Sequence, residues 1–261
     1  MVFFDIYIQA LAIILFVMFF TWLISIIISN ASIVDSVWGT GFVVLSIFYF
    51  LQTNQSSLIN IILLVLVSLW GLRLSIHITI RNWGKGEDYR YQNFRQNYGP
   101  KRYWWISFFQ VFLLQGILLW LISVPLLATF YAGKESLNFI HFLGIMIWII
   151  GFTFEAGGDI QLMRFKSKSE NKGKLLTKGF WKYTRHPNYF GDAAVWWAYG
   201  LFSIASGYYI PVLGSVLMTF LIIKISGVAM LEKSLIEKKP DYKNYIQSTS
   251  AFIPWFNKKS K

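Results

Sequence analysis

The chain has 261 residues, of which 56% are apolar, 19% aromatic and only 14% charged, although the formal net charge is +12. An average soluble domain has about 25% charged residues, so this composition argues against a soluble domain and excludes a disordered chain. The absence of cysteine excludes disulfides, thiolate catalysis and cysteine-ligated zinc. The three histidines, His77, His141 and His186, lie far apart in the sequence, and we expect no metal site.

Seven apolar stretches follow one another along the chain, each near the ~20 residues that a helix needs to cross a bilayer. A backbone inside hydrocarbon must satisfy its own hydrogen bonds, so helices are expected. The sequence therefore predicts an all-α, polytopic integral membrane protein that forms a single seven-helix domain over residues 1–261. The predicted helices cover residues 6–29, 33–51, 58–80, 106–131, 138–161, 188–206 and 209–231.

Basic residues gather in alternate connections of this predicted bundle. The segments after the third, fifth and seventh stretches hold 21 of the 24 Lys and Arg residues, whereas the opposite connections hold only Lys134. Loops rich in Lys and Arg stay in the cytoplasm, so the N-terminus is expected outside and the C-terminus inside. A multi-pass protein of a bacterial inner membrane accounts for the positive charge without nucleic acid, and no required protein partner is evident.

Ionisable residues lie inside the predicted helices, on their cytoplasmic halves, and such residues are costly and usually functional. Arg73 and His77 share one helix face because they are four residues apart. An intramembrane pair such as Asp35 with Arg73 is one explanation. A polar cavity open to the cytoplasm is favoured because six residues share this side: Asp35, Arg73, His77, Glu155, Asp159 and Asp192.

The most specific segment joins the most basic connection to the sixth stretch. Pro187 is compatible with a helix start, so Arg185, His186 and Asn188 surround a helix N-terminus, which favours a phosphate. The preceding residues 171–177, with Lys174 among them, are basic enough to wrap an anionic ligand. A basic loop attracted to anionic lipid headgroups is the alternative explanation. No Rossmann or P-loop motif is present.

These residues resemble the signature of the steroid 5-alpha-reductase-like membrane family, in its broad bacterial branch. The resemblance spans most of the chain and includes Asp35-x-x-Trp38-Gly39, Glu87-Asp88-x-Arg90-Tyr91 and Tyr242-x-x-Tyr245. It is carried above all by Gly179-x-Trp-x-Tyr-Thr-Arg-His-Pro-Asn-Tyr-x-Gly-Asp192. Members of this family are seven-helix proteins that bind NADPH from the cytoplasmic side and reduce a conjugated carbon–carbon double bond.

The resemblance implies a set of NADPH contacts in this chain. Glu155 stands where the family has Asn, and Lys166 where it has Arg. With the motif residues and the basic segment, the residues expected to contact NADPH are Glu155, Asp159, Lys166, Lys174, Tyr183, Arg185, His186, Asn188, Tyr189, Asp192, Glu232, Tyr242 and Tyr245.

The chain differs from the family pattern at the residues that bind the substrate. Steroid reductases hold the ketone oxygen with a Glu on the second helix and a Tyr on the third, but here the second helix offers Asp35 and Ile78 stands at the Tyr position. We expect the catalytic residues to be Asp35, Arg73 and His77, with Asp35 or His77 as the acid and Arg73 stabilising negative charge.

The expected activity is NADPH-dependent reduction of a lipid-like enone, steroid or isoprenoid, within a membrane. Isoprenylcysteine and phospholipid methyltransferases, which bind S-adenosylmethionine, share the Arg-His-Pro-x-Tyr stretch and provide an alternative. A lipid-binding membrane protein without catalytic activity is a further alternative, but it leaves the polar residues on the cytoplasmic side without a purpose.

Overall fold

The structure is a computed structural model that describes residues 2–226, 228, 232, 235, 236, 239 and 242–257. These residues are almost entirely helical, and the only β-type pairing among them is an isolated parallel bridge between Thr184 and Ser250. Within this described part of the chain, five helices are long and apolar enough to cross a membrane. These helices are Phe3–Ile27, Ile33–Thr53, Leu58–Asn82, Pro100–Ala132 and Phe139–Lys166. The prediction of an all-α membrane protein is therefore confirmed for the described residues.

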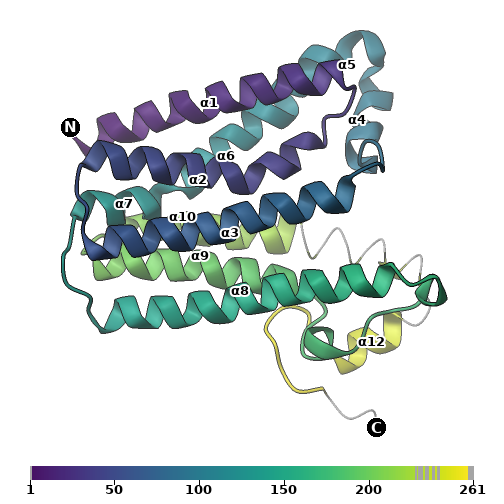
Figure 1. The fold of residues 1–261 in the computed structure, drawn as a ribbon. Helices are drawn as coiled ribbons and strands as arrows, with labels where there is room; N and C mark the ends of the chain where they lie inside the picture. The colour runs from purple at the N-terminus through teal and green to yellow at the C-terminus, as the bar shows by residue number, and fades with distance from the viewer. Residues whose placement is uncertain are drawn as a thin grey trace. The chain divides into compact units, whose positions relative to one another are not determined.

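The chain forms two compact units, Met1–Leu137 with Ser206–Pro211, and Asn138–Ala205 with Val212–Lys261. In the first unit, helices α1, α2 and α3 run side by side (Figure 1). Its elements are α1 (Phe3–Ile27), α2 (Ile33–Thr53), α3 (Leu58–Asn82), α4 (Tyr89–Tyr98), α5 (Pro100–Ser107), the π-helix η1 (Phe108–Leu113), α6 (Leu114–Ile122) and α7 (Val124–Ala132).

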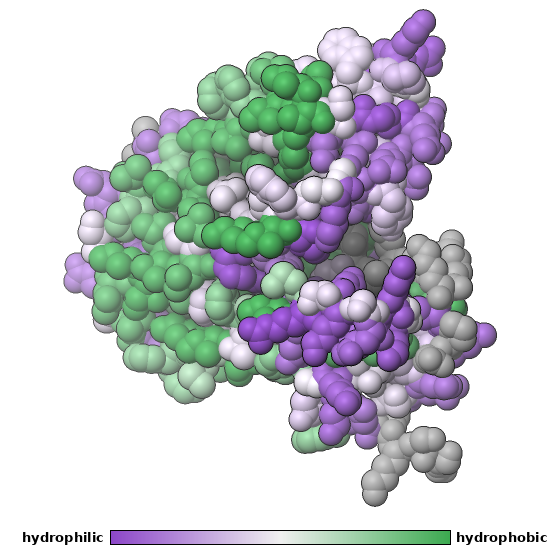
Figure 2. All heavy atoms as spheres, turned by 45° about the vertical axis from the view of Figure 1, so that its right-hand side comes forward, coloured by the Kyte–Doolittle hydropathy of each residue, from purple (hydrophilic) through white to green (hydrophobic). Residues whose placement is uncertain are grey.

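Helix α1 shows how apolar residues divide between core and lipid. Ile6, Ala10, Ile14 and Met18 recur every four residues and are buried. The remaining surface of α1 is also apolar, with exposed large side chains such as Phe16. A helix that is apolar all round suits a lipid environment. In Figure 2, hydrophobic residues gather on the left of the view and most hydrophilic residues on the right.

Helices α2 and α3 approach closely at a pair of glycines. A Cβ atom on Gly39 would lie 2.2 Å from the carbonyl oxygen of Gly71, and one on Gly71 would lie 2.5 Å from the oxygen of Gly39. Only glycine fits at both positions, as is common where membrane helices pack through small residues.

The second unit is built on the packing of α8 (Phe139–Lys166) against α9 (Pro187–Ala205). Glycines again bring the backbones together, because a Cβ on Gly191 would lie 2.4 Å from the backbone nitrogen of Glu155. Asn138 caps α8, and its side chain accepts hydrogen bonds from the backbone of Ile140 and His141. The shorter elements are η2 (Ser169–Asn171), η3 (Gly179–Lys182), η4 (Ile210–Val212) at the boundary of the units, α10 (Leu213–Phe220), the π-helix η5 (Leu221–Ser226) and α12 (Tyr242–Ser248).

Several predicted helix boundaries are corrected. The fourth helix begins at Pro100 rather than 106, since Gly99, at φ 72°, ends α4 and Pro100 starts the next helix. A turn at Ser123, two residues before Pro125, divides its second half into α6 and α7. Helix α8 continues five residues beyond the predicted end to Lys166, where Arg164 and Lys166 suit the negative end of the helix dipole. In the seventh predicted stretch, 209–231, residues 227 and 229–231 lie outside the described residues.

Candidate functional site

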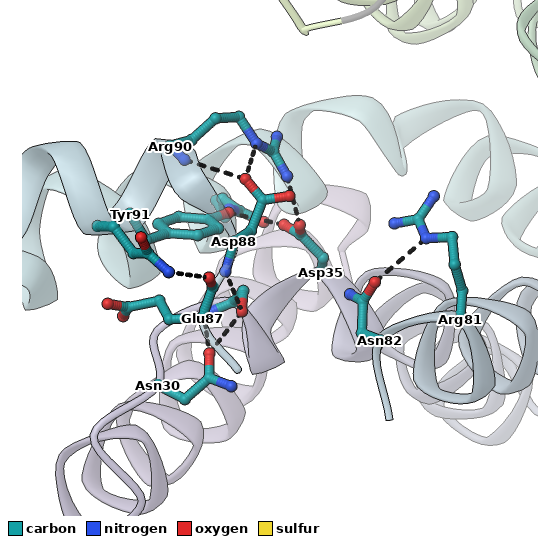
Figure 3. Close-up of polar contacts among 11 residues, drawn as sticks. Asn30, Asp35, Arg81, Asn82, Glu87, Asp88, Arg90 and Tyr91 are labelled. Atoms are coloured by element: carbon teal, nitrogen blue, oxygen red, sulfur yellow. Dashed lines mark hydrogen bonds and ion pairs between the residues drawn. The ribbon is translucent and has the colours of Figure 1, made fainter. Parts of the chain in front are cut away.

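A polar cluster in the first unit surrounds Asp35 at the start of α2. Oδ2 of Asp35 accepts a hydrogen bond from Arg90 at 2.7 Å, and Oδ1 accepts one from the hydroxyl of Tyr91, also at 2.7 Å (Figure 3). Gln115 of α6 donates to the same hydroxyl at 3.3 Å. Both carboxylate oxygens of Asp35 therefore accept hydrogen bonds from α4.

The start of α4 holds Arg90 and Tyr91 in place. Asp88 is the N-cap of α4 and accepts from the backbone N–H and the Nε of Arg90, at 3.0 and 2.9 Å. Burial alone would raise the pKa of Asp88, but the hydrogen bonds and charge of Arg90 outweigh it and lower that pKa. Burial and the negative charge of Asp35 raise the pKa of Tyr91, so its phenol stays protonated at neutral pH.

A second ion pair ties the α4 segment to the turn between α1 and α2. Glu87 accepts hydrogen bonds from Nε and Nη2 of Arg95, both at 2.9 Å, and from the backbone N–H of Ala31 at 2.7 Å. The hydrogen bonds that Arg95 donates to Glu87 raise the pKa of Arg95. This pair fixes the segment that brings Arg90 and Tyr91 to Asp35.

Arg73 and His77 lie four residues apart on α3, in the same unit as Asp35, and both are half-buried. Their roles as catalytic residues stay predictions. The sequence analysis noted the Glu87-Asp88-x-Arg90-Tyr91 stretch but gave it no role. The signal that identifies it is Asp88, a preferred N-cap residue, followed by a polar segment that ends at Gly99.

The second unit brings together many of the residues predicted to contact NADPH. Glu232 lies at their centre, because its Oε1 accepts hydrogen bonds from Nε of Arg185 at 2.8 Å, Nε2 of His186 at 3.1 Å and the hydroxyl of Tyr242 at 3.4 Å. The hydrogen bond from His186, followed by those from Arg185, lowers the pKa of Glu232 to about 2 against the effect of burial.

Arg185 also binds the backbone near the C-terminus. Its Nη1 donates to the carbonyl oxygens of Ile246 and Thr249, and its side chain is almost fully buried. The described partners thus occupy Nε, Nη1 and Nη2 of Arg185. This geometry gives Arg185 a positioning role in addition to the predicted contact with a phosphate.

A cavity of about 550 Å³ lies directly beside this group. Its size is within the range of small-molecule sites, about 300–1,000 Å³. Apolar side chains such as Phe165 and Trp181 form part of its wall, and none of the described residues that line it is acidic. The basic lining residues are Lys166, Lys168, Lys172, Lys174, Arg185 and Lys239.

The lysines come from segments far apart in the sequence. Lys239 donates from Nζ to the carbonyl oxygen of Lys174 at 2.6 Å, which holds the loop after α8 against the C-terminal part of the chain. Tyr242 and Tyr245 also line the cavity, and the hydroxyl of Tyr245 donates to the carbonyl of Trp181. Lys172 lies in the segment 171–177 that the sequence predicts to wrap an anionic ligand, whereas Lys168 and Lys239 were missed as site residues although both belong to the basic segments.

The other predicted residues are placed around the start of α9. Asn188 donates from Nδ2 to Oδ1 of Asp159 at 3.1 Å, so these two predicted contacts are neighbours. Tyr189 stacks on the ring of His186 with centroids 5.7 Å apart. Among the residues predicted to contact NADPH, those that do not line the cavity are Glu155, Asp159, Tyr183, His186, Asn188, Tyr189, Asp192 and Glu232.

Comparison with known protein families identifies a family that matches most of the chain. A family described as "Protein of unknown function (DUF1295)" matches residues 21–249. The chain belongs to this family. The family is related to steroid 5-alpha-reductase-like proteins, which agrees with the resemblance in the sequence.

A relative in the fission yeast Schizosaccharomyces pombe is described as an uncharacterized protein. It is 25% identical over 258 residues, and the alignment covers 89% of this chain and 75% of the relative. No solved structure matches the chain.

Proposed function

We propose that this protein is an NADPH-dependent membrane reductase that reduces a conjugated carbon–carbon double bond in a lipid-like enone. The observation that carries the proposal is the cavity of the second unit, with five lysines and one arginine in its lining. NADPH has three phosphate groups, and Lys is a common phosphate ligand. The relation of the family to steroid 5-alpha-reductase-like proteins supports the same chemistry.

The charge of the cavity also weighs against the methyltransferase alternative. S-adenosylmethionine has a positively charged sulfonium, for which a wall of lysines without a described acidic side chain is unfavourable. A phosphorylated dinucleotide gains from the same wall, and the 2′-phosphate of NADPH adds negative charge that NADH lacks.

In the proposed reaction, NADPH supplies a hydride to the β-carbon of the enone when it is bound. A donor in the protein stabilises the negative charge that develops on the carbonyl oxygen, and a proton then reaches the α-carbon. His77 is the better candidate for the proton donor, because Asp35 accepts hydrogen bonds from Arg90 and Tyr91 with both oxygens. Arg73 stabilises negative charge without giving up its proton.

The proposed topology has seven crossings, with the N-terminus outside and the C-terminus in the cytoplasm of a bacterial inner membrane. In addition to the five long helices, α9 has 19 residues and Ile210–Ile225 forms a shorter apolar helix. The concentration of Lys and Arg in the segments after α3 and α8 and near the C-terminus supports this orientation.

The experiment that tests the cavity as the NADPH site measures the Kd for NADPH of detergent-purified variants. The double variant Lys174→Gln, Lys239→Gln removes two lining charges. We expect the Kd to rise by about tenfold or more, which corresponds to about 1.4 kcal/mol. The control is Lys178→Gln, which removes a charge from the same loop but not from the cavity lining. An equal Kd in the double variant and the control would reject the cavity as the site.

A further inference from the structure

The end of the described chain, residues 251–257, has no helix or strand and carries large apolar side chains in contact with solvent. Residues Ile253, Trp255 and Phe256 are 66, 68 and 76% exposed. Three such residues within four positions form a contiguous apolar patch, and patches of this kind mark contact with a partner or with a membrane. The described neighbours do not cover the patch.

The backbone of this segment is nevertheless firmly held. Trp255 donates its N–H to the carbonyl of Tyr183 at 2.9 Å, and the hydroxyl of Thr184 donates to the carbonyl of Phe252 at 2.9 Å. The N–H of Arg185 donates to the carbonyl of Ser250, also at 2.9 Å. The exposed side chains therefore project from a segment whose backbone is hydrogen-bonded to residues 183–185.

One side of the segment faces the protein and the other does not. The ring of Phe252 packs against that of Phe190 on α9, with centroids 6.1 Å apart. Ile253 and Trp255 alternate with the less exposed Phe252 and Pro254 along the backbone, and Phe256 after them is exposed as well. The side of the segment that the protein leaves uncovered is therefore apolar.

The depth of this segment in a bilayer is inferred from α8, one of the five long apolar helices. Helix α8 has 28 residues, and about 20 residues, counted from Phe139, suffice to cross the hydrocarbon and reach Gly158. Pro187 lies beside this point, because a Cβ on Gly158 would be 3.1 Å from its Cγ. The C-terminal segment pairs with residues 183–185, which end two positions before Pro187, and this places it at the boundary between hydrocarbon and headgroups.

We infer that Ile253, Trp255 and Phe256 form an interfacial anchor that inserts among the headgroups of an anionic bilayer. Tryptophan is enriched at this depth of membrane proteins. The sequence continues with Lys258, Lys259 and Lys261, whose positive charges favour anionic lipid over a neutral surface. Thr249, whose carbonyl accepts a hydrogen bond from Arg185, lies four residues before Ile253.

The test uses the absence of cysteine from the chain, which makes a single introduced cysteine a unique site for a spin label. Asn257→Cys places a nitroxide beside the anchor without altering its side chains, and Glu170→Cys places one in the exposed loop after α8 as the control. The labelled proteins are reconstituted in vesicles of phosphatidylcholine with or without phosphatidylglycerol. Accessibility to oxygen and to a water-soluble nickel chelate then reports the depth of each label.

We expect the label at position 257 to be protected from nickel and accessible to oxygen, with more protection when phosphatidylglycerol is present. The label at position 170 should stay accessible to nickel in both kinds of vesicle. Adding Trp255→Gln and Phe256→Gln should remove the protection at position 257, while an unchanged circular dichroism spectrum shows that the fold is kept.

Two results would overturn the anchor. One is equal nickel accessibility at positions 257 and 170 in vesicles that contain phosphatidylglycerol. The other is dipolar broadening between labels at position 257, which would show that a second copy of the chain covers the patch instead of lipid. Neither result depends on whether the protein binds NADPH.

Discussion

Arg185 and Glu232 form an ion pair with 2.7 Å between Nη2 and Oε1, although 47 residues separate them in the sequence. The pair joins the start of α9 to the C-terminal part of the second unit. Because Arg185 also binds the carbonyls of Ile246 and Thr249, one guanidinium fixes three segments beside the lysine-lined cavity.

This pair predicts that the protein is less stable in acid. The pKa of Glu232 is about 2 in the folded chain and about 4.5 ordinarily, so the unfolded chain takes up this proton first as the pH falls. The stability from Glu232 is complete above pH 4.5 and is lost between about pH 4.5 and pH 2. We expect Glu232→Gln to lower the melting temperature at pH 7, with a difference from wild type that shrinks across this range.

The matched control for this prediction is Glu170→Gln, which changes an exposed carboxylate in the loop of the same unit. Its melting temperature should follow that of the wild type at each pH. A Glu232→Gln difference that stays constant from pH 6 to the acid limit would contradict the assigned role of the pair.

We expect replacement of Asp35 and replacement of His77 to have different effects on melting temperature and on turnover. Asp35→Asn breaks the ion pair with Arg90, so it should lower the melting temperature, and the double variant with Arg90→Gln should recover part of the loss. His77→Gln should leave the melting temperature nearly unchanged and reduce enone-dependent NADPH oxidation about 10²-fold or more. Both quantities are measured on the same purified samples.

The opposite pattern would assign the acid to Asp35. If Asp35→Asn abolished turnover with no change in melting temperature, its contacts with Arg90 and Tyr91 would be catalytic rather than structural. Unchanged turnover in His77→Gln would then remove His77 from the catalytic residues.

The contact of α2 with α3 predicts that a methyl group added at Gly39 destabilises the protein. Gly39→Ala places a Cβ against the backbone oxygen of Gly71, which cannot move without shifting a helix. Overpacking of this kind costs about 1–3 kcal/mol, and thermal unfolding in detergent should show it. Gly116→Ala is the control, because its Cβ would meet flexible Leu15 and Met18 side chains at 3.1 Å or more. Equal melting temperatures in the two variants would refute the close contact.

The proposed topology is checked by single-cysteine labelling in intact cells. Ser136→Cys lies in the connection before α8 and Ser167→Cys in the basic connection after it. A membrane-impermeant maleimide should label position 136 from outside and label position 167 only after the cells are opened. Labelling in the reverse order would invert the orientation.

The sequence predicted the long helices well because apolar length alone determines where a chain can cross hydrocarbon. It missed α4, whose residues are polar or aromatic and whose charged side chains pair with Asp35 and Asp88 or with Glu87. The interruption at Ser123 was also missed, since Pro125 sits within an otherwise continuous apolar stretch.

Much of the candidate site was also present in the sequence, but the pairing of its members was not. Arg185 and Glu232 were both assigned to the cofactor site, yet their separation along the chain gives no indication that they bind each other. The partners of Asp35 come from the start of α4, 55 and 56 residues away. Contacts over such separations depend on how helices pack, which periodicity and spacing do not determine.

The most direct test of the proposed function is the melting temperature of the detergent-purified protein with NADPH, NADH or S-adenosylmethionine. A ligand that binds the folded state stabilises it by about 2.7 kcal/mol at a hundredfold excess over Kd. We expect NADPH to raise the melting temperature most, because its 2′-phosphate meets the lysine-lined cavity, and S-adenosylmethionine to have little effect. A clear rise with S-adenosylmethionine and none with NADPH would contradict the reductase and favour a methyltransferase.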